Sequence, residues 1–167
     1  MIHAKTQRRE GVGADVERIA SLAVDCGFRI HDQLGPGLLE SVYEAVLAQS
    51  LARHGLSIER QKPIRIRFDG LVIDEGFRAD LLVEGRLPIE LKCSERFALV
   101  HTRQLLTYLR LMDLPLGLLM NFGTATFREG IKRVANGHNP FASSRLCVSL
   151  KDGSTICVST EPCPGQR

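Results

Sequence analysis

Apolar and polar positions alternate between Phe77 and Lys92, which predicts two short strands joined near Glu84-Gly85. One row of alternating positions is apolar throughout and comprises Phe77, Ala79, Leu81, Val83, Leu87, Ile89 and Leu91. The other row holds Asp80 and Glu90. Only a loop with an odd number of residues, for instance Val83-Glu84-Gly85, brings the apolar rows onto one face. The same loop places the two carboxylates on a common face.

Helical spacing of apolar residues predicts two helices before these strands. The first begins at Asp15, is weakened in its middle by Gly27, and ends before Gly35-Pro36-Gly37. The second begins near Leu38 and ends at His54-Gly55. These helices would form one wall of the core.

Three further strands and one helix are predicted. A strand over 58–68, then Asp69-Gly70, then a strand from Leu71 is a hairpin pattern, and the second strand continues through Gly76, as a bulge or bend, towards Asp80. A helix over 102–112 and a buried strand over 116–122 follow, which predicts a right-handed crossover with parallel strands. Residues 127–134 fit either a strand or a helix.

This order predicts an α/β fold with a mixed central sheet flanked by helices. We expect residues 1–13 to form a flexible arm, residues 14–137 to form one domain, and residues 138–167 to form a tail. Alternation over 146–150 and again over 156–158 predicts a hairpin in that tail.

Composition limits the function classes. The chain has 167 residues, which suits one domain. Its net charge of +3 permits a nucleic-acid partner, and the lack of Trp argues against an aromatic base-stacking platform. No apolar stretch is long enough to span a membrane, and the polar N-terminus does not read as a signal peptide. We therefore expect a cytoplasmic protein without a membrane partner.

The polar row of the hairpin is the candidate chemistry. Asp80 and Glu90 offer the oxygen ligands that Mg²⁺ prefers, and Lys92 follows Glu90 on the same side, about 6.6 Å along the strand. A metal and an ammonium group so placed suit phosphodiester hydrolysis. The alternative is a solvated strand face with a weak ion pair between Glu90 and Lys92.

The predicted element order, with Asp80 followed by Glu90-Leu91-Lys92, resembles the restriction-endonuclease-like αβββαβ core of the PD-(D/E)xK nuclease superfamily. Ala79 stands where that superfamily usually has Pro before the Asp. Residues 37–43, GLLESVY, are similar to the motif of the GxxExxY protein family, and residues 104–109 and 117–123 resemble its later blocks. The resemblance covers roughly residues 15 to 136.

The resemblance implies a Mg²⁺- or Mn²⁺-dependent nuclease acting on nucleic acid, with DNA as the expected partner. It implies that Asp80 and Glu90 bind the metal, that Lys92 positions water or phosphate, and that Glu40 is a further metal ligand. Glu40 is equally well explained as a surface glutamate near a helix start.

The same resemblance places Gln104 and Tyr108, four residues apart on one helical face, in contact with the nucleic-acid backbone. The alternative is a Tyr ring packed in the core beside a surface Gln. Arg78 would contact phosphate or pair with Asp80. Lys132 and Arg133 would either extend a phosphate-binding surface or form a solvated basic face.

The cysteines raise one further possibility. Some nucleases of this superfamily hold an iron–sulfur cluster with one early and three late cysteines, and this chain has Cys26, then Cys147, Cys157 and Cys163. The close C-x2-C pair of those enzymes is missing, so no cluster is expected.

Two other readings stay open from the sequence. One is a catalytically inactive module of the same fold that binds nucleic acid or a protein partner. The other is a scaffold that associates through edge pairing of the tail hairpin. The sequence does not indicate an oligomeric state.

Overall fold

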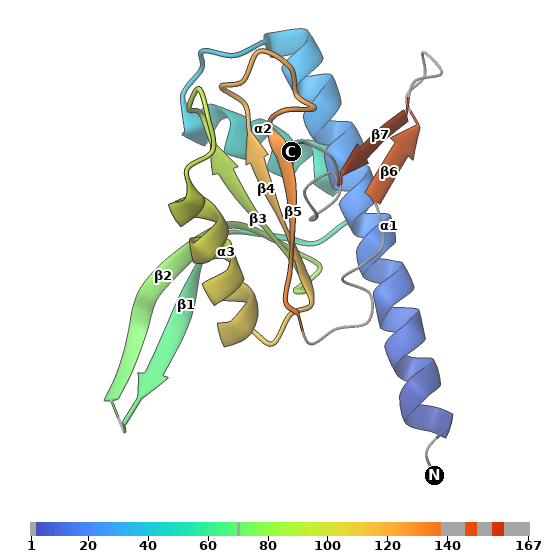
Figure 1. The fold of residues 1–167 in the computed structure, drawn as a ribbon, viewed down its shortest axis with the longest axis vertical. Helices are drawn as coiled ribbons and strands as arrows, with labels where there is room; N and C mark the ends of the chain where they lie inside the picture. The colour runs from blue at the N-terminus through green and yellow to red at the C-terminus, as the bar shows by residue number, and fades with distance from the viewer. Residues whose placement is uncertain (1–2, 70, 138–145, 150–154, 159–167) are drawn as a thin grey trace, which may run out of the picture.

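Five strands form one mixed sheet in the order β1-β2-β3-β4-β5 in a computed structural model of the chain, with helices on both faces (Figure 1). The structure describes residues 3–69, 71–137, 146–149 and 155–158. Its elements are α1 (His3–Leu34), α2 (Glu40–Arg53), β1 (Ile58–Phe68), β2 (Leu71–Val83), β3 (Leu87–Lys92), α3 (Leu99–Leu111), β4 (Leu116–Asn121), β5 (Ile131–Ala135), β6 (Leu146–Ser149) and β7 (Thr155–Val158). The predicted α/β class is confirmed.

The pairing of the strands follows the predicted topology. β1, β2 and β3 form an antiparallel meander, and β4 lies parallel to β3 after the crossover through α3. The undecided segment over 127–134 overlaps β5, a strand that pairs antiparallel with β4. The sheet is therefore mixed, with β1 and β5 at its edges.

The turn between β2 and β3 decides which side chains share a face. Val83 pairs with Leu87, so the loop is Glu84-Gly85-Arg86, and both Glu84 (φ 53°) and Gly85 (φ 62°) adopt the left-handed conformation. The loop has the odd length that the apolar rows require, displaced by one residue from the example predicted. Asp80 and Glu90 consequently share a face.

The core has two apolar clusters, one on each face of the sheet. Leu81, Val83, Ile89 and Leu91 pack with α1 and α2. Ala79 packs instead with α3, and the Phe77 ring contacts Tyr108 of α3 at 5.4 Å between centroids. The prediction of a single apolar row from Phe77 to Val83 is therefore wrong, because Ala79 and Leu81 pack in different clusters.

Helix α1 differs from its prediction at the start and in the middle. It begins at His3, so the expectation that residues 3–13 lie outside the helix is wrong; Gly11 and Gly13 lower helix propensity but do not end the helix. Gly27 has a packing role, since a Cβ atom there would lie 2.3 Å from Cζ of Phe127. The predicted stop holds, because α1 ends at Leu34 and Gly35 follows with φ 66°.

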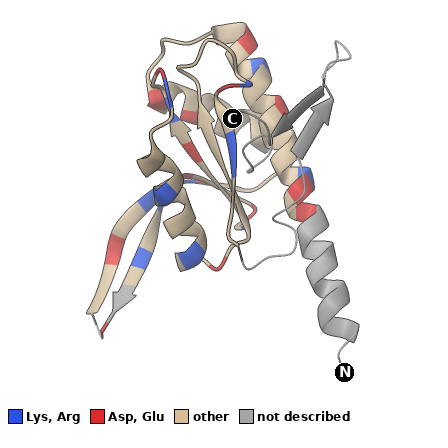
Figure 2. Cartoon of the chain, in the orientation of Figure 1, with Lys and Arg blue, Asp and Glu red and all other residues tan. Residues whose placement is uncertain are grey.

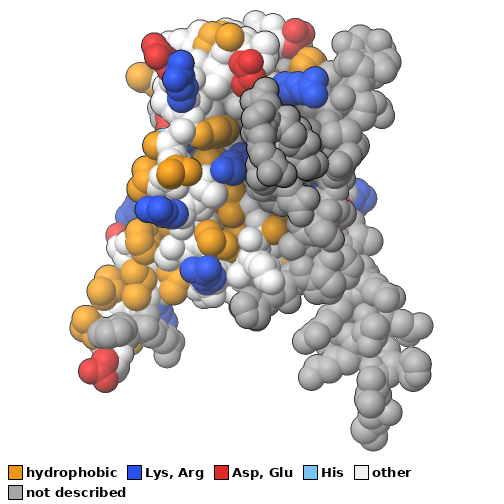
Figure 3. All heavy atoms as spheres, in the orientation of Figure 1, with side chains coloured by type: hydrophobic (Ala, Val, Ile, Leu, Met, Phe, Trp, Pro, Cys, Tyr) orange, Lys and Arg blue, Asp and Glu red, His pale blue; other side chains and the backbone are white. Residues whose placement is uncertain are grey.

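The β1–β2 ribbon projects from the body of the sheet (Figure 1). Phe68 pairs with Leu71, as a two-residue connection requires. The register shifts between Ile64, opposite Phe77, and Ile66, opposite Ile73, so the predicted irregularity near Gly76 is present on the facing strand. Figure 3 shows hydrophobic side chains gathered along this ribbon and over α3. Asp80 lies where the ribbon joins the body.

The predicted tail hairpin is present as β6 and β7, which pair antiparallel with Leu146 opposite Val158. The segment between these strands, 150–154, lies outside the described residues. None of the helices in the described part is both long and apolar enough to cross a bilayer.

Candidate active site

Asp80 and Glu90 meet where β2 separates from β3. The ladder pairs Leu81 with Ile89, and beyond this pair Asp80 turns its carboxylate onto the β3 backbone, where Oδ2 accepts a 2.7 Å hydrogen bond from the Leu91 N–H. Burial raises the pKa of Asp80 despite this bond.

Lys92 joins the cluster from the end of β3. Its Nζ donates to Glu90 Oε1 at 2.8 Å and to the Leu91 carbonyl at 2.6 Å, and lies 3.8 Å from Glu40 Oε1. Figure 2 shows acidic and basic segments adjacent on β3. The structure thus brings Asp80, Glu90, Lys92 and Glu40 together, and the register and helix packing of separate elements produce the convergence.

Tyr43 positions the start of α2, where Glu40 lies. Its ring is fully buried and stacks on Phe122 with 4.5 Å between centroids. The hydroxyl donates to the Gly35 carbonyl at 2.5 Å and accepts from the Leu38 N–H at 3.2 Å. Both ends of the loop before Glu40 are therefore held by one side chain.

Asn121 positions the segment after Lys92. It is fully buried, its Oδ1 accepts from the backbone N–H groups of Ser94 and Gly123 at 3.0 Å, and its Nδ2 donates to the Ser94 carbonyl at 2.7 Å. Phe122 N–H also donates to the Lys92 carbonyl at 2.7 Å. The end of β4 thus fixes the backbone at the end of β3.

Burial raises the pKa values of the carboxylates in this site. Glu90 is 3% exposed, and burial together with the nearby Asp80 charge raises its pKa to about 7. Its Oε2 is buried with no hydrogen-bond partner among the described residues. Burial also raises the pKa of Glu40. For Lys92, burial works against the charged form, but the bond to Glu90 and the surrounding carboxylates raise its pKa overall.

A family model described as the PD-(D/E)XK nuclease superfamily matches residues 17–134, well over half of the chain. The chain belongs to this superfamily. Comparison with curated proteins gave no match, and neither did comparison with solved structures. The matched range contains Glu40, Asp80, Glu90 and Lys92, and nucleases of this superfamily generally use divalent metals such as Mg²⁺.

The donor set fits the divalent metal of this nuclease superfamily. Four carboxylates (Glu40, Glu44, Asp80, Glu90) face two cations (Arg60, Lys92), so two negative charges remain when all are ionised. In the described part of the chain no group of three or more His, Cys, Asp or Glu side chains is placed to hold a metal. Asp80 and Glu90 are the two carboxylates that could hold such an ion, with water and substrate oxygens completing its shell, as is common for Mg²⁺.

Glu44 and Gln61 adjoin the cluster and were not predicted. Glu44 is 5% exposed and accepts from Arg60 Nε at 2.8 Å and from Gln61 Nε2 at 2.6 Å. Gln61 Nε2 also lies 3.4 Å from Asp80 Oδ1. Glu44 was detectable as the residue four after Glu40 on the same helical face. No sequence signal marks Gln61.

On α3, Tyr108 takes the second of its two predicted roles, a ring packed in the core, and the role of Gln104 stays a prediction. Gln104 is half-buried and its Nε2 donates to the Tyr108 hydroxyl. Tyr108 is 1% exposed and packs in the core, where burial raises its pKa to about 12. Direct contact of Tyr108 with a nucleic-acid backbone does not fit this burial, because almost none of its surface is accessible.

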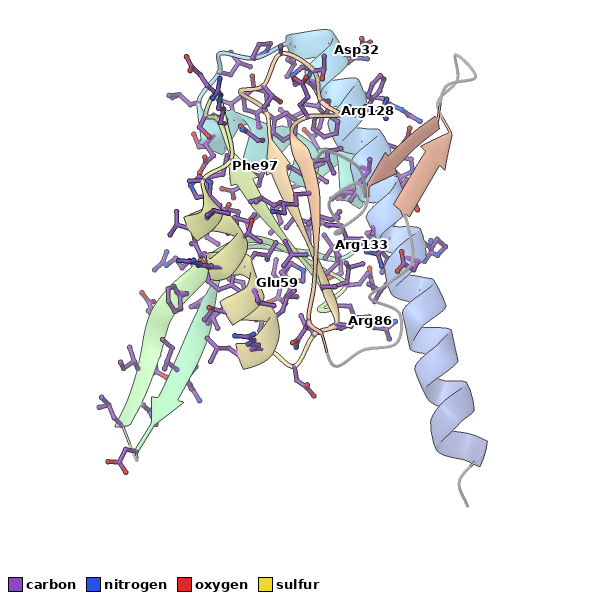
Figure 4. All side chains as sticks on the ribbon, in the orientation of Figure 1. Asp32, Glu59, Arg86, Phe97, Arg128 and Arg133 are labelled. Carbon is purple, nitrogen blue, oxygen red and sulfur yellow. The ribbon has the colours of Figure 1, made fainter. Side chains whose placement is uncertain are left out.

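Two basic residues also have other partners. Arg78 pairs with Glu75 at 2.8 Å, so the suggested pairing with Asp80 is wrong. Arg133 is 1% exposed and lies between β5 and α1, where it pairs with Glu17 (Figure 4). The prediction that Arg133 belongs to a solvated basic face or to a phosphate-binding surface is therefore wrong. Lys132 is half-buried.

The cysteines leave the iron–sulfur question untested. Cys26 is buried and Cys93 is half-buried, and both are free thiols. Cys147 and Cys157 lie opposite each other in β6 and β7, and Cys163 lies outside the described residues. The expectation that no cluster forms stays a prediction.

Proposed function

We propose that this chain is a Mg²⁺- or Mn²⁺-dependent nuclease that hydrolyses phosphodiester bonds in nucleic acid, with DNA as the expected substrate. The observation that carries the proposal is the convergence of Asp80, Glu90 and Lys92 at one point of the sheet, with Glu90 Oε2 buried and unpartnered among the described residues. Leaving such an oxygen unpaired costs about 1–3 kcal/mol or more, and a bound cation removes that cost.

Asp80 and Glu90 would hold the metal, and Glu40, at the start of α2, would contribute at the rim of the site. When bound, the metal supplies a Lewis acid that polarises the phosphate and acidifies a water molecule. The chain's own part is to hold these oxygens together against their mutual repulsion.

Lys92 would orient the reactants. Its ammonium group has three N–H donors, of which Glu90 Oε1 and the Leu91 carbonyl take two. The third can hold a phosphate oxygen or the attacking water. Because its raised pKa keeps Lys92 protonated at neutral pH, it acts as a charge and a hydrogen-bond donor and does not accept the proton of the water.

The remaining assignments rest on the motifs. We assign the chain to the GxxExxY family from residues 37–43 and place it in the cytoplasm. Gln104, half-buried on α3 beside Tyr108, and Arg78, exposed on the ribbon, are the proposed contacts to the nucleic-acid backbone. Tyr108 would act through Gln104, which it holds by a hydrogen bond.

Cleavage of labelled single- and double-stranded DNA and RNA, with and without Mn²⁺, tests the proposal. Asp80→Asn, Glu90→Gln and Lys92→Met keep side-chain size and should each lower the rate about 100-fold or more. Asp74→Asn, on the exposed ribbon, is the matched control and should cleave like wild type. Wild-type rates in all three site variants would assign the cleavage to a contaminant.

An inactive binding module of the same fold is the second candidate. It is favoured by the ion pair between Lys92 Nζ and Glu90 Oε1 at 2.8 Å, which already neutralises one of the two carboxylates that would hold the metal. Calorimetry that shows no heat with Mn²⁺, together with intact binding of nucleic acid, would support this candidate over the nuclease.

A further inference from the structure

Gln61 has a strained backbone at the edge of the site. Four non-glycine residues of the described chain have positive φ, and of these only Gln61 (φ 49°) lies inside a strand; Asp69, Glu84 and Asp113 lie in turns or at a helix end. The left-handed conformation is unfavourable for a residue with a Cβ atom, and persists where its surroundings enforce it.

The Gln61 side chain bridges two carboxylates from different elements. Its Nε2 donates to Glu44 Oε2 of α2 at 2.6 Å and lies 3.4 Å from Asp80 Oδ1 of β2. An NH₂ group has two donors, which matches two acceptors that cannot donate. The amide must therefore present nitrogen to this pair, because its oxygen would face two further acceptors.

Glu44 supplies a firm anchor for the bridge. It is 5% exposed, and its other oxygen accepts from Arg60 Nε at 2.8 Å. Arg60 and Gln61 are adjacent in β1, so one carboxylate of α2 clamps two consecutive residues of the strand. The clamp thus engages Gln61 at the position where its backbone has positive φ.

We propose that Gln61 is a positioning residue that, anchored by Glu44, holds the Asp80 carboxylate in the orientation that binds the metal. The inference rests on the proposed function. Asp80 is then held through both oxygens, Oδ2 by the Leu91 N–H and Oδ1 by the Gln61 amide. Held in this way, the carboxylate has restricted rotation, and its remaining lone pairs would be available to a bound cation.

Gln61→Gly tests the assignment, because it removes the amide and also relieves the backbone strain. The variant should fold with a Tm within about 4 °C of wild type. Its Mn²⁺ affinity, measured by calorimetry without nucleic acid, should fall about 10- to 100-fold, as for other residues that orient metal ligands. Gln61→Asn also tolerates positive φ but is one carbon short, and should show the same loss.

Asp113→Gly is the matched control. Asp113 also has positive φ (52°), follows the C-cap of α3, and lies at the opposite end of β4 from Asn121 and Lys92. This substitution relieves the same kind of strain without touching the site, so metal affinity and cleavage should equal those of wild type.

The outcomes separate the inference from the proposed function. Wild-type protein that binds Mn²⁺ and cleaves, together with Gln61→Gly and Gln61→Asn variants of unchanged Mn²⁺ affinity, overturns the inference and leaves the function intact. Wild-type protein that neither binds Mn²⁺ nor cleaves overturns both. Loss of affinity in both variants, with Tm and the Asp113→Gly control unchanged, supports the inference.

Discussion

At the scale of single residues, the site concentrates charge that the fold alone does not neutralise. Glu90 is buried, has one oxygen bound to Lys92 and one without a partner among the described residues. A carboxylate in that position is more stable when protonated or when bound to a cation. Its environment therefore makes the stability of the metal-free protein depend on pH.

The free energy of unfolding of the metal-free protein should fall as pH rises from about 5 to 7. Glu90 has a pKa of about 7 in the folded chain against 4.5 as its ordinary value, so between these pH values the folded state binds more protons than the unfolded state. The raised pKa of Asp80 and of Glu40 acts in the same direction. Thermal unfolding measured in EDTA at several pH values checks this expectation.

Glu90→Gln isolates the contribution of Glu90. The variant should show a weaker decline of Tm with pH and should be more stable than wild type near pH 8, whereas Glu129→Gln, an exposed carboxylate, should behave like wild type. Mn²⁺ should restore the stability of wild type at pH 8. An identical pH dependence in Glu90→Gln and wild type would contradict the assignment.

At the scale of elements, close helix–loop packing sets the position of α1. Gly27 approaches the buried Phe127 ring, which also lies 5.3 Å from Phe122 and 5.7 Å from His31 between ring centroids. The ring has little room to move, because aromatic neighbours lie on two sides. Glycine at this position serves packing, although it lowers helix propensity.

Gly27→Ala should destabilise the protein by about 1–3 kcal/mol, because the added methyl group clashes with Phe127. Helix propensity alone predicts the opposite, a gain of about 1 kcal/mol. Denaturant unfolding distinguishes the two signs. In a Phe127→Leu background, which makes room, Gly27→Ala should cost less, and equal costs in both backgrounds would exclude the clash.

At the scale of the whole molecule, the site is assembled from four elements that the sheet and its two helical layers bring together. Glu40 and Glu44 come from α2, Gln61 from β1, Asp80 from β2, and Glu90 and Lys92 from β3. Asn121 of β4 supports the backbone after Lys92. None of these residues comes from the tail. In the described part of the chain, the site and the contacts that support it lie within residues 35–123.

Removal of residues 138–167 should therefore leave Mn²⁺ affinity and cleavage unchanged. The five-stranded sheet is complete at β5, and β6 and β7 form a separate two-stranded sheet. Calorimetry, a cleavage assay and the Tm of the shortened chain test this expectation. Loss of metal binding in a folded, shortened chain would contradict it, and a change in elution on gel filtration would show that the tail supports self-association.

The sequence by itself determined the local pattern of the fold. Alternation with period two predicted β1, β2 and β3, though not β5, and required an odd loop between β2 and β3, which placed Asp80 and Glu90 on one face. Helix stops at Gly35 and His54-Gly55 follow from backbone geometry, which is a local property. These features were predictable because each depends on a few neighbouring residues.

Only the tertiary structure decided what approaches from elsewhere in the chain. The packing of α2 on the sheet sets the distance of Glu40 from Lys92 and anchors Gln61 on Glu44. The packing of α3 buries Tyr108, and the contact between α1 and β5 buries Arg133 beside Glu17. The packing of Ala79 and Leu81 in different clusters departs from strict alternation, so a period of two does not predict it. Such contacts join residues far apart in the chain, so no local pattern contains them.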